Sequence, residues 1–305
     1  MTTAVSLSIA VLLGSLAYAG WALREVAAGA NGYWFVAAIP VAALAIPTLL
    51  TAWWFALAWV YRAPRPPEAR IAASRIPALF LHEMLAIAWS VPRMILYRAL
   101  LRDPAPAPAT APVLLLHGVL CNAGVWLPIV RYLAARGIGP LYTLSYGPPL
   151  ASIDRFADQA SAKLDAILAA TGATQVIIVG HSMGGLVARA CARRHGSERV
   201  RRIITLGTPH HGSILAYLFF GVSLSQLRPR SRWLLALNDR HGFAEPPITS
   251  IWSWHDSMVA PQTSSVLEGA RNEAVVGIGH NALLADPEVL RRLATEIVDA
   301  SPRDV

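Results

Sequence analysis

A serine between two glycines follows an apolar run near the middle of the chain. Residues 176–184 read VIIVGHSMG, with Ser182 between Gly180 and Gly184. A serine hydroxyl acts as a nucleophile when a base removes its proton and the backbone presents it to a substrate. The pattern G-x-S-x-G directly after a strand does this in a tight strand-to-helix turn. Ordinary glycine-rich turns also match this short pattern, but VIIV before it and GLVARACARR after it favour a catalytic serine.

Short apolar runs and helical patterns alternate around this motif. The runs with strand character are Val113–Leu116, Leu141–Ser145, Val176–Val179, Arg202–Leu206, Ile248–Trp254 and Ala274–Val276. The segments with helical spacing are Val125–Arg136, Ser152–Ala170, Leu186–His195 and Pro287–Val298. Apolar strands separated by amphipathic helices indicate a parallel sheet covered on both faces. Such a sheet binds its ligands outside the carboxyl ends of its strands, where the serine motif falls.

The N-terminal part of the chain is far more apolar than the rest. The whole chain has only 14% charged residues, against about 25% in an ordinary soluble domain. Thr3–Leu23 and Tyr33–Tyr61 contain no charged residue, and a spanning helix needs about 20 apolar residues. Pro40 and Pro47 in the second run would kink a helix without preventing it from spanning. We therefore expect a transmembrane helical hairpin over residues 1–61.

The charges that flank this hairpin predict its orientation. The turn holds Arg24 beside Glu25, whereas several arginines follow the second run: Arg62, Arg65, Arg70 and Arg75. By the positive-inside rule the turn lies outside, and residues after 61 lie in the cytoplasm. This predicts a multi-pass protein of the bacterial inner membrane with a cytoplasmic catalytic domain. A cleaved signal peptide is the alternative, because residues 17–19 (AYA) resemble a cleavage site, although no basic residue precedes the run.

Residues 62–111 join the hairpin to the predicted sheet. Pro64, Pro66 and Pro67 end the second helix. Residues 76–101 are apolar with sparse charges and a proline at position 92. We expect a helix pair there, at the membrane surface or packed on the catalytic domain, rather than a third crossing. The sequence DPAPAPATAP at 103–112 is typical of a semi-rigid linker, so the catalytic domain is predicted to span residues 112–305.

Charge and cysteine content exclude some classes of function. The net charge is +8, but no interleaved basic and aromatic platform for nucleic acid is present. Arginines that face anionic lipid explain the positive net charge better than nucleic-acid binding does. Cys121 and Cys191 form no C-x-x-C pair and no disulfide framework. No acidic cluster marks a metal site, no cofactor is expected, and the oligomeric state is left open.

Three motifs together resemble the α/β-hydrolase superfamily, specifically its bacterial lipase and esterase branch. They are VIIVGHSMGGLVAR at 176–189, LLLHG at 114–118 and LGTPHHGS at 206–213. The resemblance covers about residues 112–300. It implies an α/β-hydrolase fold, here with a reduced, mostly parallel sheet of about six strands after an all-α membrane segment. Only the linker and residues 76–101 precede the first strand, so we expect residues 76–101 to cover the surface that missing strands leave exposed.

The resemblance implies a catalytic triad in the chain order serine, acid, histidine. Asp256 follows the fifth predicted strand, with a valine and a proline shortly after it. His280 ends the sequence GIGH after the sixth predicted strand. In the implied mechanism His280 takes the proton from Ser182 and later protonates the leaving alcohol, while Asp256 orients and stabilises the imidazole.

Other acids and histidines compete for these roles. The alternative residues are Asp239, Glu245 and Asp286 for the acid, and His210, His211 and His255 for the base. The first two acids precede the fifth strand and the third comes late in the chain. The two histidines at 210–211 follow the fourth strand, where packing and hydrogen bonding in a loop explain them better.

The resemblance also implies an oxyanion hole and a substrate pocket. The backbone amides of Met183 and Val119 are expected to form the oxyanion hole, with Leu120 as the alternative to Val119. Gly118 would allow the backbone to approach the substrate. The expected pocket residues are His117, Gly118, Leu120 and His181, and Cys121 is expected to line the pocket without acting as a nucleophile.

Residues 213–245 form an insertion before the fifth strand. They are apolar at 217–220 and basic at Arg228, Arg230 and Arg232. A lid or acyl-chain wall and a plain pair of connecting helices fit this pattern equally well.

The expected function is a membrane-anchored serine hydrolase that cleaves acyl esters through an acyl-enzyme intermediate. Its expected partners are a lipid or other hydrophobic ester and the bilayer, and no nucleic acid. An acyltransferase or thioesterase with the same triad, and a membrane scaffold without catalytic activity, are the alternatives.

Overall fold

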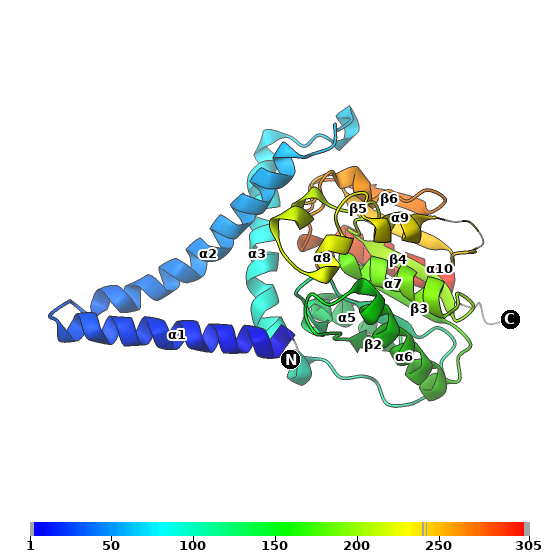
Figure 1. Cartoon of the computed structure of the whole chain (residues 1–305), viewed down its shortest axis with the longest axis horizontal. Coiled ribbons are helices and arrows are strands. Elements are labelled where there is room, and N and C mark those ends of the chain that lie inside the picture. Colours follow the sequence, from blue (N-terminus) through cyan, green and yellow to red (C-terminus); the bar gives the residue numbers. More distant parts are fainter. Residues whose placement is uncertain (1–2, 240, 242, 302–305) are drawn as a thin grey trace.

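The computed structural model describes residues 3–239, 241 and 243–301 of the chain. Figure 1 shows an α/β part beside a group of long N-terminal helices. These helices are α1 (Thr3–Ala27), α2 (Tyr33–Val60) and α3 (Ile76–Ile95), followed by the short helix α4 (Tyr97–Leu100). Helices α1 and α2 diverge from the turn that joins them, and α3 lies between α2 and the α/β part (Figure 1).

Length and composition make three segments of the described chain candidates for membrane spans. They are Ser8–Ala27, Tyr33–Val60 and Pro67–Ile95. The first two lie in the predicted hairpin, and α2 continues through both of its prolines. Many large apolar side chains on α1 and α2 are exposed, including Leu13, Trp34 and Leu49. Such surfaces are typical of helices that face lipid rather than water.

Segment 76–101 differs from the expected helix pair interrupted at Pro92. Helix α3 continues through Pro92 to Ile95, and α4 begins at Tyr97. Pro92 lies in the last turn of α3, where it has no N–H to donate to the helix, and Met94 is buried against the α/β part. Packing on the α/β part is one of the two placements that the sequence left open. The length of α3 also makes it a third candidate span, whereas the sequence predicted two.

The α/β part contains one six-stranded sheet in the order β2-β1-β3-β4-β5-β6. The strands are β1 (Val113–Leu116), β2 (Leu141–Leu144), β3 (Val176–His181), β4 (Val200–Leu206), β5 (Ile248–Ser253) and β6 (Arg271–Val275). Every neighbouring pair is parallel, which confirms the predicted parallel sheet. The sixth strand begins three residues earlier than predicted. It is an edge strand whose first residues are polar and mostly exposed, so the apolar pattern marks only its end.

Helices cover both faces of the sheet. They are α5 (Leu127–Ala134), α6 (Ile153–Thr171), α7 (Met183–His195) and α10 (Pro287–Ala300). Successive residues of β1 point to opposite faces: Leu114 packs with α6 and α7, whereas Leu115 packs with α5 and α10. Ser152 caps α6 by accepting a hydrogen bond from Arg155 N, and Asp286 caps α10. Because all neighbouring strands are parallel, their carboxyl ends meet along one edge of the sheet.

Short helices occupy the connections. They are η1 (Pro67–Ala69), η2 (Ala73–Arg75), η3 (Ala123–Trp126), η4 (Ile214–Leu218), α8 (Val222–Gln226), α9 (Arg232–Asn238), η5 (Gln262–Ser265) and η6 (Ala282–Leu284). The insertion 213–245 holds η4, α8 and α9. Its residues 217–222 are largely apolar and exposed, with Phe220 90% exposed. The ring of Phe219 lies 5.8 Å from that of Trp54 on α2, so this apolar tip lies beside the N-terminal helices.

Candidate active site

Ser182 lies in a strained turn between β3 and α7. Its backbone has φ 56° and ψ −128°, a region that costs a non-glycine residue about 1–3 kcal/mol. The flanking glycines are required by packing, because a Cβ at Gly180 would overlap the backbone of α7 and one at Gly184 would overlap the backbone at the end of β1. Ser182 N donates to Leu206 O (2.9 Å), and Thr208 Oγ1 donates to Ser182 O (2.8 Å). The end of β4 thus holds the turn in place.

Asp256 and His280 form a buried hydrogen-bonded pair after β5 and β6. Asp256 Oδ2 accepts a hydrogen bond from His280 Nδ1 at 2.8 Å. The other carboxylate oxygen of Asp256 accepts from the backbone N–H groups of Met258 (2.8 Å) and Val259 (2.7 Å). These bonds orient the carboxylate toward the imidazole. Because the carboxylate can only accept, Nδ1 of His280 carries a proton, and Nε2 of the neutral ring has a free lone pair.

The surroundings of His280 favour its protonated form. Burial lowers the pKa of His280, but the charge and hydrogen bond of Asp256 and the charge of Glu83 outweigh burial, so its pKa lies above the ordinary value. An imidazole that is stabilised as a cation is suited to accept a proton during a reaction. His280 can therefore serve as a general base through Nε2.

The end of β3 brings a second imidazole next to His280. His181 Nε2 donates to the carbonyl oxygen of His280 (3.1 Å), and the two ring centroids lie 4.7 Å apart. Burial, together with the charge of His280, places the pKa of His181 well below its ordinary value. Gly207, directly after β4, packs closely against Asp256: a Cβ at this position would lie 3.1 Å from Asp256 Oδ2. His181 is thus held neutral, and of the two rings His280 is the one suited to carry a proton near pH 7.

The loop after β1 lies against the serine. A Cβ at Gly118 would be 2.9 Å from the Cβ of Ser182, so glycine allows this close approach. Val119 and Leu120 follow in the same loop, and Leu120 adopts a positive φ of 54°. Met183 is buried at the first position of α7, where backbone N–H groups have no partner within the helix. The expected oxyanion-hole residues therefore lie on both sides of the serine.

A small cavity of about 10 Å³ lies in this region. Its lining includes His117, Gly118, Val119, Leu120, Cys121 and Met183. His181, which was also expected to line the pocket, instead contacts His280. Burial raises the pKa of Cys121 to about 12, which disfavours a reactive thiolate. The volume is close to that of one water molecule, and Leu150 and the α8 residue Ser223 are also among the lining residues.

His117 is buried beneath the same loop. Its Nδ1 donates to Gly118 O (2.9 Å), and its ring stacks on Tyr146 with centroids 4.0 Å apart. The hydroxyl of Tyr146 donates to the carbonyl oxygen of His117. Burial lowers the pKa of His117 to about 4. These contacts make His117 a neutral support for the loop.

The competing residues have other contacts in the structure. Glu245 Oε1 accepts from Arg189 Nε at 2.8 Å in a buried ion pair. Asp286 accepts from the first backbone N–H groups of α10. His210 is buried next to Thr205, with 3.2 Å between His210 Nε2 and Thr205 Oγ1. Among these candidates, only Asp256 and His280 form a carboxylate–imidazole pair.

Glu83 on α3 is a buried residue that the sequence analysis missed. It is 0% exposed, and both of its oxygens accept hydrogen bonds from the loops that carry the carboxylate–imidazole pair. The donors are Ser257 Oγ (2.7 Å), Asn281 N (3.0 Å), Asn281 Nδ2 (2.9 Å) and Ala282 N (2.9 Å). Ser257 and Asn281 directly follow Asp256 and His280, so α3 anchors both loops. The one acidic residue in the mostly apolar segment 76–101 was the available sequence signal.

No group of three or more His, Cys, Asp or Glu side chains in the described part of the chain could hold a metal ion.

Known proteins resemble this chain in sequence over limited stretches. Residues 111–232 match the family described as alpha/beta hydrolase fold. Triacylglycerol lipases of Pseudarthrobacter phenanthrenivorans and Burkholderia plantarii are each 46% identical to it over 59 residues. This match covers 19% of this chain and 18% and 16% of the two lipases, so the chain spans less than a fifth of the length of these curated relatives.

Solved structures share the fold at low sequence identity. The mature lipase BlEst2 of Bacillus licheniformis has a TM-score of 0.56 at 17% identity, covering 66% of this chain and 96% of the lipase. Lipase B of Aspergillus fumigatus has a TM-score of 0.61 at 17% identity, covering 86% and 82%. With its parallel six-stranded sheet, this chain has the alpha/beta hydrolase fold, and lipases are among its homologues.

Proposed function

We propose that this protein is a membrane-anchored serine hydrolase that cleaves carboxylic esters of lipids. The main support is the buried hydrogen bond between His280 Nδ1 and Asp256 Oδ2, at the same sheet edge as the strained Ser182. A serine, a carboxylate and an imidazole, in this chain order, are the parts of a catalytic triad in this fold.

In the proposed reaction, Ser182 Oγ attacks the ester carbonyl carbon while His280 Nε2 takes the hydroxyl proton. The backbone N–H groups of Met183 and Val119 donate to the resulting oxyanion, and Asp256 stabilises the imidazolium. His280 then protonates the leaving alcohol, which leaves an acyl group on Ser182. Water, deprotonated by His280, releases the carboxylic acid and restores the serine.

The N-terminal helices support a lipid substrate. Helices α1 and α2 are long and apolar enough to cross a membrane, and the exposed apolar residues 217–222 lie beside α2. A bilayer around these helices would keep the α/β part next to lipid esters. The arginines after α2 support an orientation with the α/β part in the cytoplasm of a bacterial cell.

Labelling and hydrolysis by the full-length protein in detergent test this proposal. Wild type should react with a fluorophosphonate probe and hydrolyse p-nitrophenyl butyrate, and Ser182→Ala should do neither. Ser225→Ala, which alters an exposed serine bonded only to its own helix, is the matched control and should behave as wild type. Equal labelling of wild type and Ser182→Ala would contradict the assignment of the nucleophile, and a wild type that reacts with neither reagent would favour a scaffold.

Product analysis separates hydrolysis from acyl transfer. With a long-chain alcohol present in the micelles, the proposed hydrolase should release mainly free fatty acid. Predominant formation of a new ester would instead assign an acyltransferase that uses the same three residues.

A further inference from the structure

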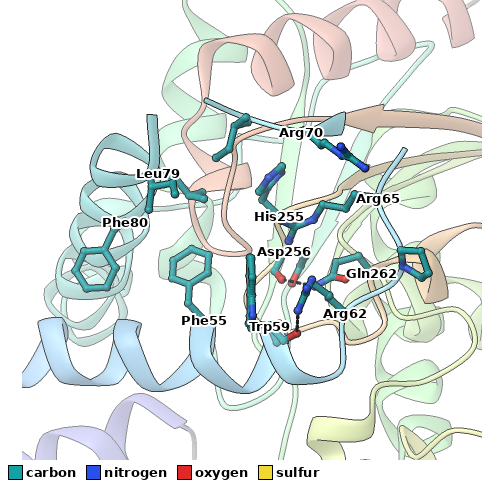
Figure 2. A pocket seen from close by; sticks show the side chains of 14 residues that line it. Phe55, Trp59, Arg62, Arg65, Arg70, Leu79, Phe80, His255, Asp256 and Gln262 are labelled. Atoms are coloured by element: carbon teal, nitrogen blue, oxygen red, sulfur yellow. Dashed lines mark hydrogen bonds between the residues drawn. The ribbon is translucent and has the colours of Figure 1, made fainter. Parts of the chain in front are cut away.

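A large cavity separates the N-terminal helices from the loop that carries Asp256. Its volume is about 640 Å³, within the range of about 300–1,000 Å³ that is usual for ligand sites. It is bounded by the end of α2, the linker before α3, the first half of α3 and the loop after β5 (Figure 2). It shares no lining residue with the small cavity beside Met183. This cavity is therefore distinct from the expected substrate pocket.

The two ends of the cavity differ in chemistry. Aromatic and aliphatic side chains of α2 and α3 form one end, where the rings of Phe55 and Phe80 lie 6.3 Å apart. The guanidinium groups of Arg62, Arg65 and Arg70 gather toward the other end (Figure 2). An occupant that matches both ends needs an apolar chain and an anionic group.

The arginines have no carboxylate partner within the described residues. Arg62 donates to Trp59 O (2.6 Å) and stacks over the Trp59 ring at 3.8 Å. Arg65 donates from Nε to Trp254 O (2.9 Å), and burial together with the charge of Arg62 lowers its pKa. The side chain of Arg70 is exposed and makes no hydrogen bond or ion pair within the described chain. Three like charges at one end of a cavity would be stabilised by a bound anion.

His255 provides a separate reason to expect a polar ligand. Gly277 N donates to His255 Nδ1 (3.1 Å), so the proton of the neutral ring is on Nε2. The side chain lines the cavity and is only 3% exposed, and Nε2 has no hydrogen-bond partner in the described structure. Burial, together with the charge of Arg65, lowers the pKa of His255 to about 4, which keeps the ring neutral. A buried N–H without an acceptor is rare, and a ligand oxygen would satisfy it.

We propose that this cavity binds an acidic phospholipid of the surrounding bilayer, with its phosphate on the arginines and one acyl chain between α2 and α3. The proposal rests on the membrane insertion in the proposed function. Trp59 lies at the carboxyl end of α2, where aromatic residues mark the lipid–water boundary. A basic pocket between helices at that level has the chemistry that recognises anionic headgroups.

Binding would also stabilise the Asp256 loop. Ala63 N donates to Gln262 Oε1 (3.1 Å), and Gln262 Nε2 donates to Asp256 O (3.1 Å). The linker that carries the arginines is thus connected to the loop by a chain of hydrogen bonds. A lipid held between them binds the folded state and raises the unfolding temperature.

Native mass spectrometry of the full-length protein in neutral detergent tests the site. Wild type should retain dioleoylphosphatidylglycerol about tenfold better than dioleoylphosphatidylcholine, and Arg70→Gln should lower that retention about fivefold. Arg102→Gln removes the same charge from an exposed residue outside the cavity and should bind as wild type. Because the side chain of Arg70 makes no hydrogen bond or ion pair in the described structure, Arg70→Gln should leave the fold intact. Phosphatidylglycerol should also raise the unfolding temperature of wild type more than that of Arg70→Gln.

Three outcomes would overturn the proposal. The first is equal retention of the two lipids, and the second is equal effects of Arg70→Gln and Arg102→Gln on that retention. The third is displacement of phosphatidylglycerol by an equal concentration of oleate, which would assign the site to a free fatty acid. Ser182→Ala should bind the lipid as wild type does. Loss of ester hydrolysis and loss of lipid binding are therefore separate results.

Discussion

Replacing Glu83 by alanine removes a carboxylate through which α3 holds the loops of Asp256 and His280. The change leaves two backbone donors, the part-buried Asn281 N and the buried Ala282 N, without their acceptor. Each unsatisfied donor costs about 1–3 kcal/mol. The variant no longer has to bury a charge, which offsets part of this loss. We expect a net destabilisation of about 2–3 kcal/mol, equivalent to about 4–12 °C in unfolding temperature for a domain of this size.

Glu83→Gln removes the charge of the side chain but keeps its shape. Its amide oxygen can accept from the two backbone N–H groups, and the Ser257 hydroxyl can turn to accept from its NH₂ group. The stability loss should therefore be smaller, about 1 kcal/mol. The charge of Glu83 contributes to the raised pKa of His280. Without it that pKa falls, so the rise of kcat/KM with pH should move to lower pH, because the neutral base appears earlier.

Thermal unfolding and a pH profile of p-nitrophenyl butyrate hydrolysis measure these two effects. Glu68→Gln, at an exposed position of the linker, is the matched control because it removes the same charge. A merely structural role of Glu83 would lower the unfolding temperature without moving the pH profile. If Glu83→Gln and Glu68→Gln gave the same unfolding temperature and the same profile, the positioning role of Glu83 would be refuted.

Further predictions concern the site itself. Asp256→Asn should lower kcat about 10⁴-fold, because the amide no longer selects the Nδ1–H tautomer of His280; a loss below tenfold in an ester assay would contradict the assignment. Gly184→Ala should abolish folding or activity, because its Cβ overlaps the end of β1; a soluble, active variant would contradict this packing. His117 has a pKa of about 4 when folded against 6.5 when free, so its contribution to stability is complete above pH 6.5 and is lost as the pH falls toward 4. This contribution is about 3 kcal/mol, and His117→Asn should flatten the pH dependence of unfolding in that range; an unchanged slope would contradict it.

Local patterns predicted most of the α/β part. Buried parallel strands such as β3 are continuous apolar runs, so their positions could be read directly, and Ser152 and Pro287 marked where helices begin. The edge strand β6 was predicted too short because its exposed residues have no apolar pattern. The extent of α3 was also missed, because the helix continues through Pro92, a residue that usually kinks or ends a helix.

Contacts between distant segments could not be predicted from one sequence. The bonds of Glu83 join residues nearly two hundred positions apart, and no local pattern encodes such a separation. The same holds for the cavity between α2 and the β5 loop, which exists only because the linker folds back onto Gln262. Asp256 and His280 were expected from the resemblance, and their roles remain predictions that the Asp256→Asn and Ser182→Ala assays test.

Helix α3 contributes both to the cavity beside α2 and to the support of the Asp256 and His280 loops. It carries Glu83 on the side that meets the Asp256 and His280 loops, and Leu79 and Phe80 along the cavity beside α2. A displacement of α3 would therefore change the support of the carboxylate–imidazole pair and the shape of the cavity together. Because these two surfaces share one rigid helix, a lipid bound between α2 and α3 stabilises the arrangement in which Glu83 reaches both loops. If so, phosphatidylglycerol should protect wild type against thermal unfolding more than it protects Glu83→Ala, in which the second contact of the helix is missing.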